Sequence, residues 1–539
     1  MDQPSVLSHP QQRSCVPDSL WRRLVQPSYS DFLFIALTAW LFLTSAEGYR
    51  ALLADGDTGW HIRTGDYILA TGQVPRTDLF SFSKPGETWF AWEWGSDVLY
   101  SLIHRQWGLR GIVWFGGLQI VLFATILFRY AMWRRANALW TVAAGMLAVG
   151  ASSVHYLARP HLFTLLFMPI CIWLVEADRR NPGRRVWWTV AITLAWTNLH
   201  GGFLGWIACL GLYFLGTALE TLFSPAAERD WRPVVRLALL GAASAAVTFV
   251  NPYGWHLHEH ISSYLQSDFI RDTIQEFQAP TFRTEDQLQY EILLLVGLMT
   301  AASLATRRRF AETLLIVFWA HQSLNSIRHI TIFSTVAAPL IAVELTRLWD
   351  WWVAAGSRKS TRAIIDAMAS DMRSNFSWTS VWPALAAAVL LLVSGLPVKW
   401  PTDFPDEKFP TKLVGKHESL IRSGRVLTTD QWADYLIYRF YPKQRVFVDG
   451  RSDFYGPVLG KEYLRAQGGS HDWRQILERH GFDRALVPLS WSLASLLKQD
   501  PSWRIVADDG KALLFERVKG GEEASLAPPG NFPNSALMN

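Results

Sequence analysis

Long apolar runs separated by short polar connections dominate the first 400 or so residues of the chain. A helix of roughly 20 apolar residues matches the thickness of the hydrocarbon core of a bilayer, so this pattern predicts about eleven transmembrane helices. The predicted segments are 31–48, 111–130, 138–156, 161–176, 186–199, 203–222, 236–250, 289–306, 310–325, 330–347 and 379–397.

Basic residues recur in every second connection between these segments. Arg22 and Arg23 precede the first segment, and an arginine run at 307–309 follows the eighth. Because cytoplasmic loops carry an excess of Lys and Arg, this alternation predicts a cytoplasmic amino terminus and an external carboxyl-terminal region. The remaining connections are rich in Asp, His, Trp, Gly and Pro. Any chemistry is therefore expected on the outer face of the membrane.

The pattern changes to short strands and amphipathic helices after the last apolar run. Strands are expected near 425–428, 445–449 and 484–488, and a hairpin at 503–517. Strands that alternate with helices predict a small α/β domain. The predicted organisation is a cytoplasmic segment 1–30, a transmembrane domain 31–400 with a large first outer loop at 49–110, an extracytoplasmic α/β domain 401–519 and a disordered tail 520–539.

Composition supports a membrane protein and narrows the partners. Only 18% of the residues are charged, whereas soluble domains usually carry about a quarter. The formal charge of +5 comes from short Lys and Arg clusters between apolar runs, not from one basic face, so nucleic acid is not an expected partner. Three cysteines at unrelated positions form neither a disulfide framework nor a metal-ligand pattern.

The first outer loop contains the most concentrated chemistry. At helical spacing Asp57, Trp60 and His61 share one face, and Asp55 lies just before them. A carboxylate and an imidazole in this arrangement can orient a hydroxyl, share a metal ion or hydrogen-bond to each other. Asp57 as a helix cap is the alternative. Glu93 lies between two tryptophans, where its pKa could be raised, with an ordinary solvated glutamate as the alternative.

Polar residues also stand at the outer ends of several predicted helices. They are Arg159, His161, His200, Arg328 and His329. Charged groups at membrane depth usually face an internal cavity, and Arg binds phosphate oxygens in a bidentate manner. Together these residues predict a cationic pocket for a lipid phosphate. The alternatives are arginines that extend to the headgroups and histidines that hydrogen-bond within the core.

Several motifs together resemble those of bacterial multi-pass GT-C glycosyltransferases, in particular the group described as RgtA/B/C/D-like. The resemblance covers most of the chain. The motifs are Asp55-Gly-Asp57…Trp60-His61, Asp78-Leu-Phe80-Ser-Phe82…Glu93-Trp94, Arg159-Pro160-His161, Asn198-Leu-His200-Gly201-Gly202, Asn251-Pro-Tyr253-Gly254, Arg328-His329 and Val448-Asp449-Gly450-Arg451.

The resemblance implies a GT-C-like helical bundle in the bacterial inner membrane, with its active site at the outer leaflet. It implies a sugar donor on polyprenyl phosphate or diphosphate, and a glycan, lipid or protein acceptor. In this family a first-loop acid serves as base or binds metal, a role carried here to Asp57 first and Asp55 second, with Glu93 as a further acid for acceptor or metal. The resemblance allows a divalent metal, Mg²⁺ or Mn²⁺, without defining its ligands.

These inferences combine into a hypothesis of function. The enzyme would transfer a sugar from a polyprenyl-phosphate donor by single displacement, which inverts the anomeric centre. A first-loop Asp would take the proton of the acceptor hydroxyl, and Arg159 and Arg328 would stabilise the departing phosphate. Two alternatives remain: a lipid or polysaccharide transporter or flippase, and a non-catalytic scaffold for envelope assembly. A transporter would tend to show internal repeats and broken helices near mid-membrane.

Overall fold

The structure is a computed structural model that describes residues 20–44, 49–357, 359–374, 380–393, 396 and 398–518. The predicted tail 520–539 and most of the predicted segment 1–30 lie outside the described residues. Contacts divide the chain into two compact units. Unit 1 comprises Met1–Thr77 and Thr88–Pro405, and unit 2 comprises Asp78–Glu87 and Asp406–Asn539.

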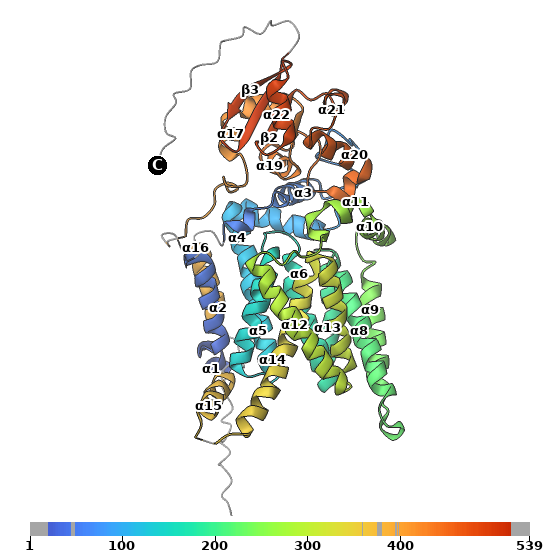
Figure 1. Ribbon diagram of the computed structural model, residues 1–539, viewed down its shortest axis with the longest axis vertical. Helices are drawn as coiled ribbons and strands as arrows, with labels where there is room; N and C mark the ends of the chain where they lie inside the picture. The colour runs from blue at the N-terminus through green and yellow to red at the C-terminus, as the bar shows by residue number, and fades with distance from the viewer. Residues whose placement is uncertain are drawn as a thin grey trace, which may run out of the picture. The chain divides into compact units, whose positions relative to one another are not determined.

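Unit 1 is helical, and a helix lies in each of the eleven segments predicted from the apolar runs. Figure 1 shows α5, α12, α13 and α14 running side by side. The helices are α1 Leu20–Val25, α2 Tyr29–Ala39, α3 Asp57–Thr71, α4 Trp94–Trp133, α5 Ala138–Ala151, α6 Leu162–Arg180, α7 Trp188–Thr197, α8 Phe203–Leu222, α9 Arg232–Val247, α10 Trp255–Gln266, α11 Asp268–Thr273, α12 Glu285–Thr306, α13 Phe310–Asn325, α14 Ile330–Ala354, α15 Thr361–Ser374 and α16 Trp382–Leu392.

Within the described residues, five helices are long and apolar enough to cross a membrane by length and composition. Two shorter apolar helices, Tyr29–Leu43 and Trp382–Leu392, accompany them. The chain is thus a multi-pass membrane protein. The five longer helices are Trp94–Trp133, Ala138–His155, Phe203–Leu222, Glu285–Thr306 and Ile327–Ala354.

Helix α4 consists of two parts that meet at Gly108. This residue has φ 59° and ψ −154°, a conformation that is accessible to glycine and strained for residues with a Cβ atom. The part before Gly108 packs against α3, and the two backbones come very close at Gly65. A Cβ atom at Gly65 would lie 1.9 Å from the carbonyl oxygen of Asp97. This close approach brings the first turn of α4 against the face of α3 that carries the polar residues.

Buried ion pairs join α4, α6 and α13 at the ends opposite to the candidate site. Arg134, at the end of α4, lies 2.9 Å from Glu176 of α6, and Arg179 lies 3.0 Å from the other oxygen of Glu176. Glu312 of α13 lies 3.7 Å from Arg134. All the charges of this group have partners, as buried charges require. The network fixes α4, α6 and α13 relative to one another and leaves the opposite helix ends to the candidate site.

Unit 2 is built on a four-stranded sheet of order β1-β2-β4-β3. β1 and β2 are parallel, and the other two pairs are antiparallel. This arrangement confirms the predicted α/β architecture. The elements are β1 Val426–Thr428, β2 Arg484–Pro488, β3 Trp503–Asp508 and β4 Ala512–Arg517, with α17 Thr411–Lys416, α18 Glu418–Arg422, α19 Asp430–Phe440, α20 Ser452–Gln467, α21 Trp473–Arg479 and α22 Ser492–Gln499.

The strand predicted at 445–449 is not a member of this sheet. Val446 forms a single parallel bridge to Ser81, from the hairpin 78–87 of the first loop. The Val446 N–H donates to the carbonyl of Phe80, and the Phe82 N–H donates to the carbonyl of Val446, both at 2.9 Å. Phe80 is fully buried. The apolar run around Val446 therefore pairs with the hairpin, which belongs to unit 2 although most of the first loop belongs to unit 1.

Candidate active site

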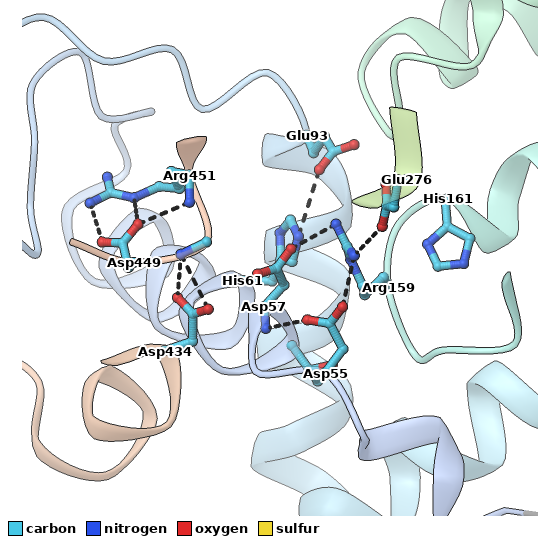
Figure 2. Close-up of polar contacts among 12 residues, drawn as sticks. Asp55, Asp57, His61, Glu93, Arg159, His161, Glu276, Asp434, Asp449 and Arg451 are labelled. Carbon is cyan, nitrogen blue, oxygen red and sulfur yellow. Dashed lines mark hydrogen bonds and ion pairs between the residues drawn. The ribbon is translucent and has the colours of Figure 1, made fainter. Parts of the chain in front are cut away.

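The centre of the site is the Arg159 guanidinium, which three carboxylates share (Figure 2). Its Nη1 lies 2.8 Å from Asp55 Oδ2 and 2.8 Å from Glu276 Oε1, and its Nη2 lies 2.7 Å from Asp57 Oδ2. The Arg159 side chain is 18% exposed and that of Asp57 is 7% exposed. We call these four residues the Arg159 cage. Their pairing is charge-assisted hydrogen bonding in a site largely shielded from water.

Local hydrogen bonds hold the first-loop acids beside Arg159. The backbone N–H of Asp57, the first residue of α3, donates to Asp55 Oδ1 at 2.9 Å. The hydroxyl of Thr58 donates to the carbonyl of Ala158 at 2.9 Å. The start of α3 is thus tied to the residue that precedes Arg159. A carboxylate at a helix amino terminus is also favoured by the helix dipole.

Glu276 joins the cage from the long connection between α9 and α12. Its carbonyl accepts from the Ser326 hydroxyl at 2.9 Å, and the Ile327 N–H donates to the Gln278 carbonyl at 3.0 Å. The Arg328 Nε lies 3.3 Å from Glu276 Oε2. Arg328 therefore stands behind Glu276 and brings a second positive charge to the same group of acids.

Glu93 faces two histidines. Its carboxylate lies 3.6 Å from His61 Nε2 through one oxygen and 3.6 Å from His200 Nε2 through the other. His61 Nδ1 lies 2.5 Å from Asp97 Oδ1, and both side chains are almost completely buried. Because Glu93 directly precedes α4 and Asp97 lies in its first turn, the two acids approach His61 from one helix start.

The neutral tautomer of His200 follows from its neighbours. The Gly202 backbone N–H donates to His200 Nδ1 at 3.0 Å, so this nitrogen is an acceptor. The Thr164 hydroxyl also donates to it, at 2.7 Å, and accepts from the Trp196 indole N–H at 3.2 Å. The remaining proton of the imidazole therefore sits on Nε2, which points towards Glu93.

Burial and charge control the protonation states at the site. Burial, followed by the Arg159 guanidinium, holds the pKa of His61 well below its usual value. Burial, followed by His161, has the same effect on the pKa of His200. Burial alone would lower the pKa of Arg159, but its carboxylate partners outweigh burial and keep it well above its usual value. Both histidines are thus neutral and Arg159 is charged near neutral pH.

These shifts predict that unit 1 loses stability on acidification below about pH 6.5, the usual pKa of a histidine. The folded pKa values of His61 and His200 lie below their unfolded values, so the unfolded chain binds more protons in that interval and stability falls as pH falls. The melting temperature should decrease from about pH 7 to about pH 5.5, and less in His200→Asn. An equal decrease in the variant would contradict the role given to His200.

The other predicted histidines occupy the surroundings. His161 Nε2 donates to the His155 carbonyl at 2.6 Å, and its ring lies 6.4 Å from that of His200. His329 Nδ1 donates to the Gln322 carbonyl at 3.2 Å and its ring lies 5.7 Å from Trp319. Both hydrogen bonds are of the kind expected if these histidines serve the packing of the protein. His161 borders the site, whereas His329 is directed into the helix packing.

Comparison with solved structures places this architecture among known folds. The archaeal oligosaccharyltransferase AglB from Archaeoglobus fulgidus, in complex with an inhibitory peptide and a dolichol-phosphate, is 11% identical over 92% of this chain and 75% of its own, with a TM-score of 0.53. The apo form of the A. fulgidus oligosaccharyltransferase is 11% identical over 85% of this chain and 69% of its own, with a TM-score of 0.54. This chain shares its fold with these oligosaccharyltransferases. No protein-family model and no curated protein matches it.

Folding brings two acids into the site that carried little signal in the sequence. Glu276 lies in the connection between α11 and α12, and nothing in the sequence pattern relates it to Arg159. Asp97 follows Glu93 by four residues, which places both on one helical face, and this spacing could have identified it. Both residues contact side chains that the sequence pattern singled out.

A divalent metal bound between the first-loop acids and Glu276 would take its ligands from the Arg159 cage. Hard cations prefer carboxylate oxygens at about 2.0–2.6 Å. The carboxylates of Asp55, Asp57 and Glu276 each already pair with Arg159. In the part of the chain that the structure describes, no group of three or more His, Cys, Asp or Glu side chains is arranged to hold a metal ion. The cage as it stands therefore does not fit a metal.

Proposed function

We propose that this chain is a membrane glycosyltransferase that moves a sugar from a polyprenyl-phosphate donor to an acceptor hydroxyl. The observation that carries the proposal is the Arg159 cage, in which a first-loop acid and a partly buried guanidinium meet at the loop ends of the helical bundle. A displacement on a phosphate-linked sugar needs this pair of groups, a base and a cation. The shared fold with an oligosaccharyltransferase solved with a dolichol-phosphate supports a lipid-linked donor.

We place the reaction at the outer face of a bacterial inner membrane. The alternation of basic connections supports a cytoplasmic amino terminus and a periplasmic carboxyl-terminal unit. Every residue of the Arg159 cage then lies in a connection on the periplasmic side. The donor enters from the outer leaflet, and the acceptor is a glycan, lipid or protein that reaches this face.

In the proposed mechanism the acceptor oxygen attacks the anomeric carbon of the donor sugar. The Asp57 carboxylate takes the proton of the acceptor hydroxyl, and the bond from the anomeric carbon to the phosphate oxygen breaks. Arg159 and Arg328 stabilise the charge that develops on the departing polyprenyl phosphate. One displacement of this kind inverts the anomeric centre. Glu93, held between His61 and His200, binds hydroxyl groups of the sugar or the acceptor.

The ion pair between Asp57 and Arg159 makes this base dependent on the donor. A carboxylate paired with a guanidinium is a weaker base than one that has lost its partner. The phosphate of the donor is a bidentate partner for Arg159 and competes with Asp57 for it. Donor binding would therefore weaken the hold of Arg159 on Asp57 and raise the basicity of the carboxylate when the acceptor arrives.

Asparagine at position 57 should abolish most of the activity. It keeps the shape of the side chain but cannot take a proton, and general-base catalysis contributes about 100- to 10,000-fold. We expect purified Asp57→Asn protein to release polyprenyl phosphate from its donor more slowly by about that factor. The measurement is the release of free polyprenyl phosphate from a panel of polyprenyl-phosphate sugars, with a hydroxyl acceptor present.

Asp66→Asn provides the matched control. Asp66 is also on α3, but it pairs with Arg63 and Arg105 and accepts from Ser101, away from the Arg159 cage. Its activity should match that of the wild type. Full activity in both Asp57→Asn and Asp55→Asn would reject a first-loop aspartate as base, and a selective loss in Glu93→Gln would move the role to Glu93. If neither the wild type nor any folded variant released polyprenyl phosphate from any donor of the panel, the glycosyltransferase proposal would be rejected.

A further inference from the structure

Three carboxylates in the Arg159 cage come from three parts of the chain that approach one another only through folding. Asp55 precedes α3, Asp57 begins it, and Glu276 lies about 220 residues further along. Three negative charges in one shielded site repel one another strongly unless a cation lies between them. Here that cation is a side chain of the protein, because each carboxylate has an oxygen within 2.8 Å of the Arg159 guanidinium.

An arrangement of this kind has the ligand chemistry of a divalent-cation site. Carboxylate oxygens from separate segments are the ligands that Mg²⁺ and Mn²⁺ prefer. The guanidinium carries one charge in place of two, but it is always protonated and cannot dissociate from the chain. Arg328 supplies the second positive charge, since its Nε lies 3.3 Å from Glu276. Together the two guanidinium groups match the charge of a divalent ion.

A metal ion could enter the cage only by displacing Arg159. The displaced guanidinium would remain largely buried and without its three carboxylates, which is strongly unfavourable for a buried charge. The Nε2 atoms of His61 and His200 contact Glu93, which is not one of the three carboxylates of the cage. The pKa of Glu276 agrees with this balance: burial would raise it, but Arg159 and Arg328 outweigh burial and hold it well below its usual value.

We propose that Arg159 takes the place of a divalent metal ion in this site and that the protein needs no such ion. Arg159 orders the carboxylates that a metal would otherwise order, and on arrival of the donor it binds the phosphate. The role in phosphate binding rests on the proposed function, whereas the ordering of the carboxylates concerns the cage alone. Removal of the Arg159 guanidinium should therefore expose a set of three acids able to bind a metal.

The experiment titrates Mn²⁺ into the full-length purified protein and follows the free ion by electron paramagnetic resonance. The wild type should leave the spectrum of free Mn²⁺ unchanged. Arg159→Ala should take up about one Mn²⁺ per chain, and the double variant Arg159→Ala, Asp57→Asn should lose this binding. Arg159→Lys retains a cation within the cage and should bind none. Melting temperatures establish that each variant is folded.

Two results would overturn the inference. One is stoichiometric Mn²⁺ binding by the wild type that disappears in Asp57→Asn, a measurement that does not depend on the folding of any Arg159 variant. The other is a folded Arg159→Ala protein that binds no Mn²⁺. Because the titration contains no donor, its result does not depend on whether the protein is a glycosyltransferase. In the donor assay, the wild type should release polyprenyl phosphate at the same rate with and without a chelator. A loss of release with the chelator that Mn²⁺ restores would also overturn the inference.

Discussion

Replacing Arg159 with alanine should lower the rate of polyprenyl phosphate release by about 100- to 1,000-fold, the usual loss when a preorganised charge-stabilising group is removed. The guanidinium contacts all three acids of the cage and is the group best placed to meet a donor phosphate. Arg159→Lys should recover only part of the rate, because an ammonium group cannot form paired hydrogen bonds to a phosphate. Release assays at saturating and at low donor concentration measure the effect.

Arg63→Ala is the matched control for this prediction. Arg63 is an arginine of α3 that pairs with Asp66 at 2.8 Å, and its side chain is 23% exposed. Its loss removes a positive charge near the site without touching the Arg159 cage, so the rate should remain close to that of the wild type. If Arg63→Ala and Arg159→Ala reduced release equally, a general loss of local charge would explain the result, and the specific role of Arg159 would be rejected.

Replacing Arg451 with alanine should destabilise unit 2 by about 3–5 kcal/mol, the usual cost of removing one partner from a buried ion pair. Arg451 lies 2.7 Å from Asp78 and 2.7 Å from Asp449, and all three side chains are at most 2% exposed. Tyr455 donates to Asp449 at 2.7 Å and completes the group (Figure 2 shows the pair of Asp449 and Arg451). Without Arg451 two carboxylates would remain buried. Limited proteolysis of the full-length protein across a urea series measures the loss.

Two further variants separate ion pairing from simple side-chain removal. Arg474→Ala removes an arginine of unit 2 that is 64% exposed and pairs with Asp500, and it should change stability little. The triple variant Arg451→Met, Asp78→Asn, Asp449→Asn removes all the charges of the group and should regain part of the stability lost in Arg451→Ala. A triple variant less stable than Arg451→Ala would show that the ion pair is not the source of the effect.

The helical part of the fold could be predicted because a long apolar run in a bilayer must satisfy its backbone hydrogen bonds internally, which favours a helix. The hairpin at 503–517 could be predicted because its two strands pair with each other across a short turn. The prediction of a strand at 445–449 was wrong for a physical reason. An apolar run shows that a segment is buried, but not what covers it, and here the cover is the hairpin 78–87, more than 350 residues earlier.

For the site, the sequence could indicate which residues stand at the loop ends of the helices, but not which of them pair. Asp57 and Arg159 were assigned separate roles, as base and as phosphate ligand, and the structure has them in one ion pair. Their pairing depends on how α3 packs against α4 and on the turn before α6, which no local pattern contains. Glu276 escapes prediction for the same reason, because its loop is positioned by contacts to residues 326–328.

The hairpin 78–87 has a consequence for the order in which the protein can be made. Asp78 leaves the ribosome 373 residues before Arg451, its buried partner. At synthesis rates of about 5–20 residues per second, this hairpin waits roughly 20 to 75 seconds for the residues that cover it. During that time Phe80 and Asp78 have no native environment while the helices of unit 1 insert. Until residues 445–451 have been made, the nascent chain therefore presents this hairpin without the segment of unit 2 that pairs with it in the folded protein.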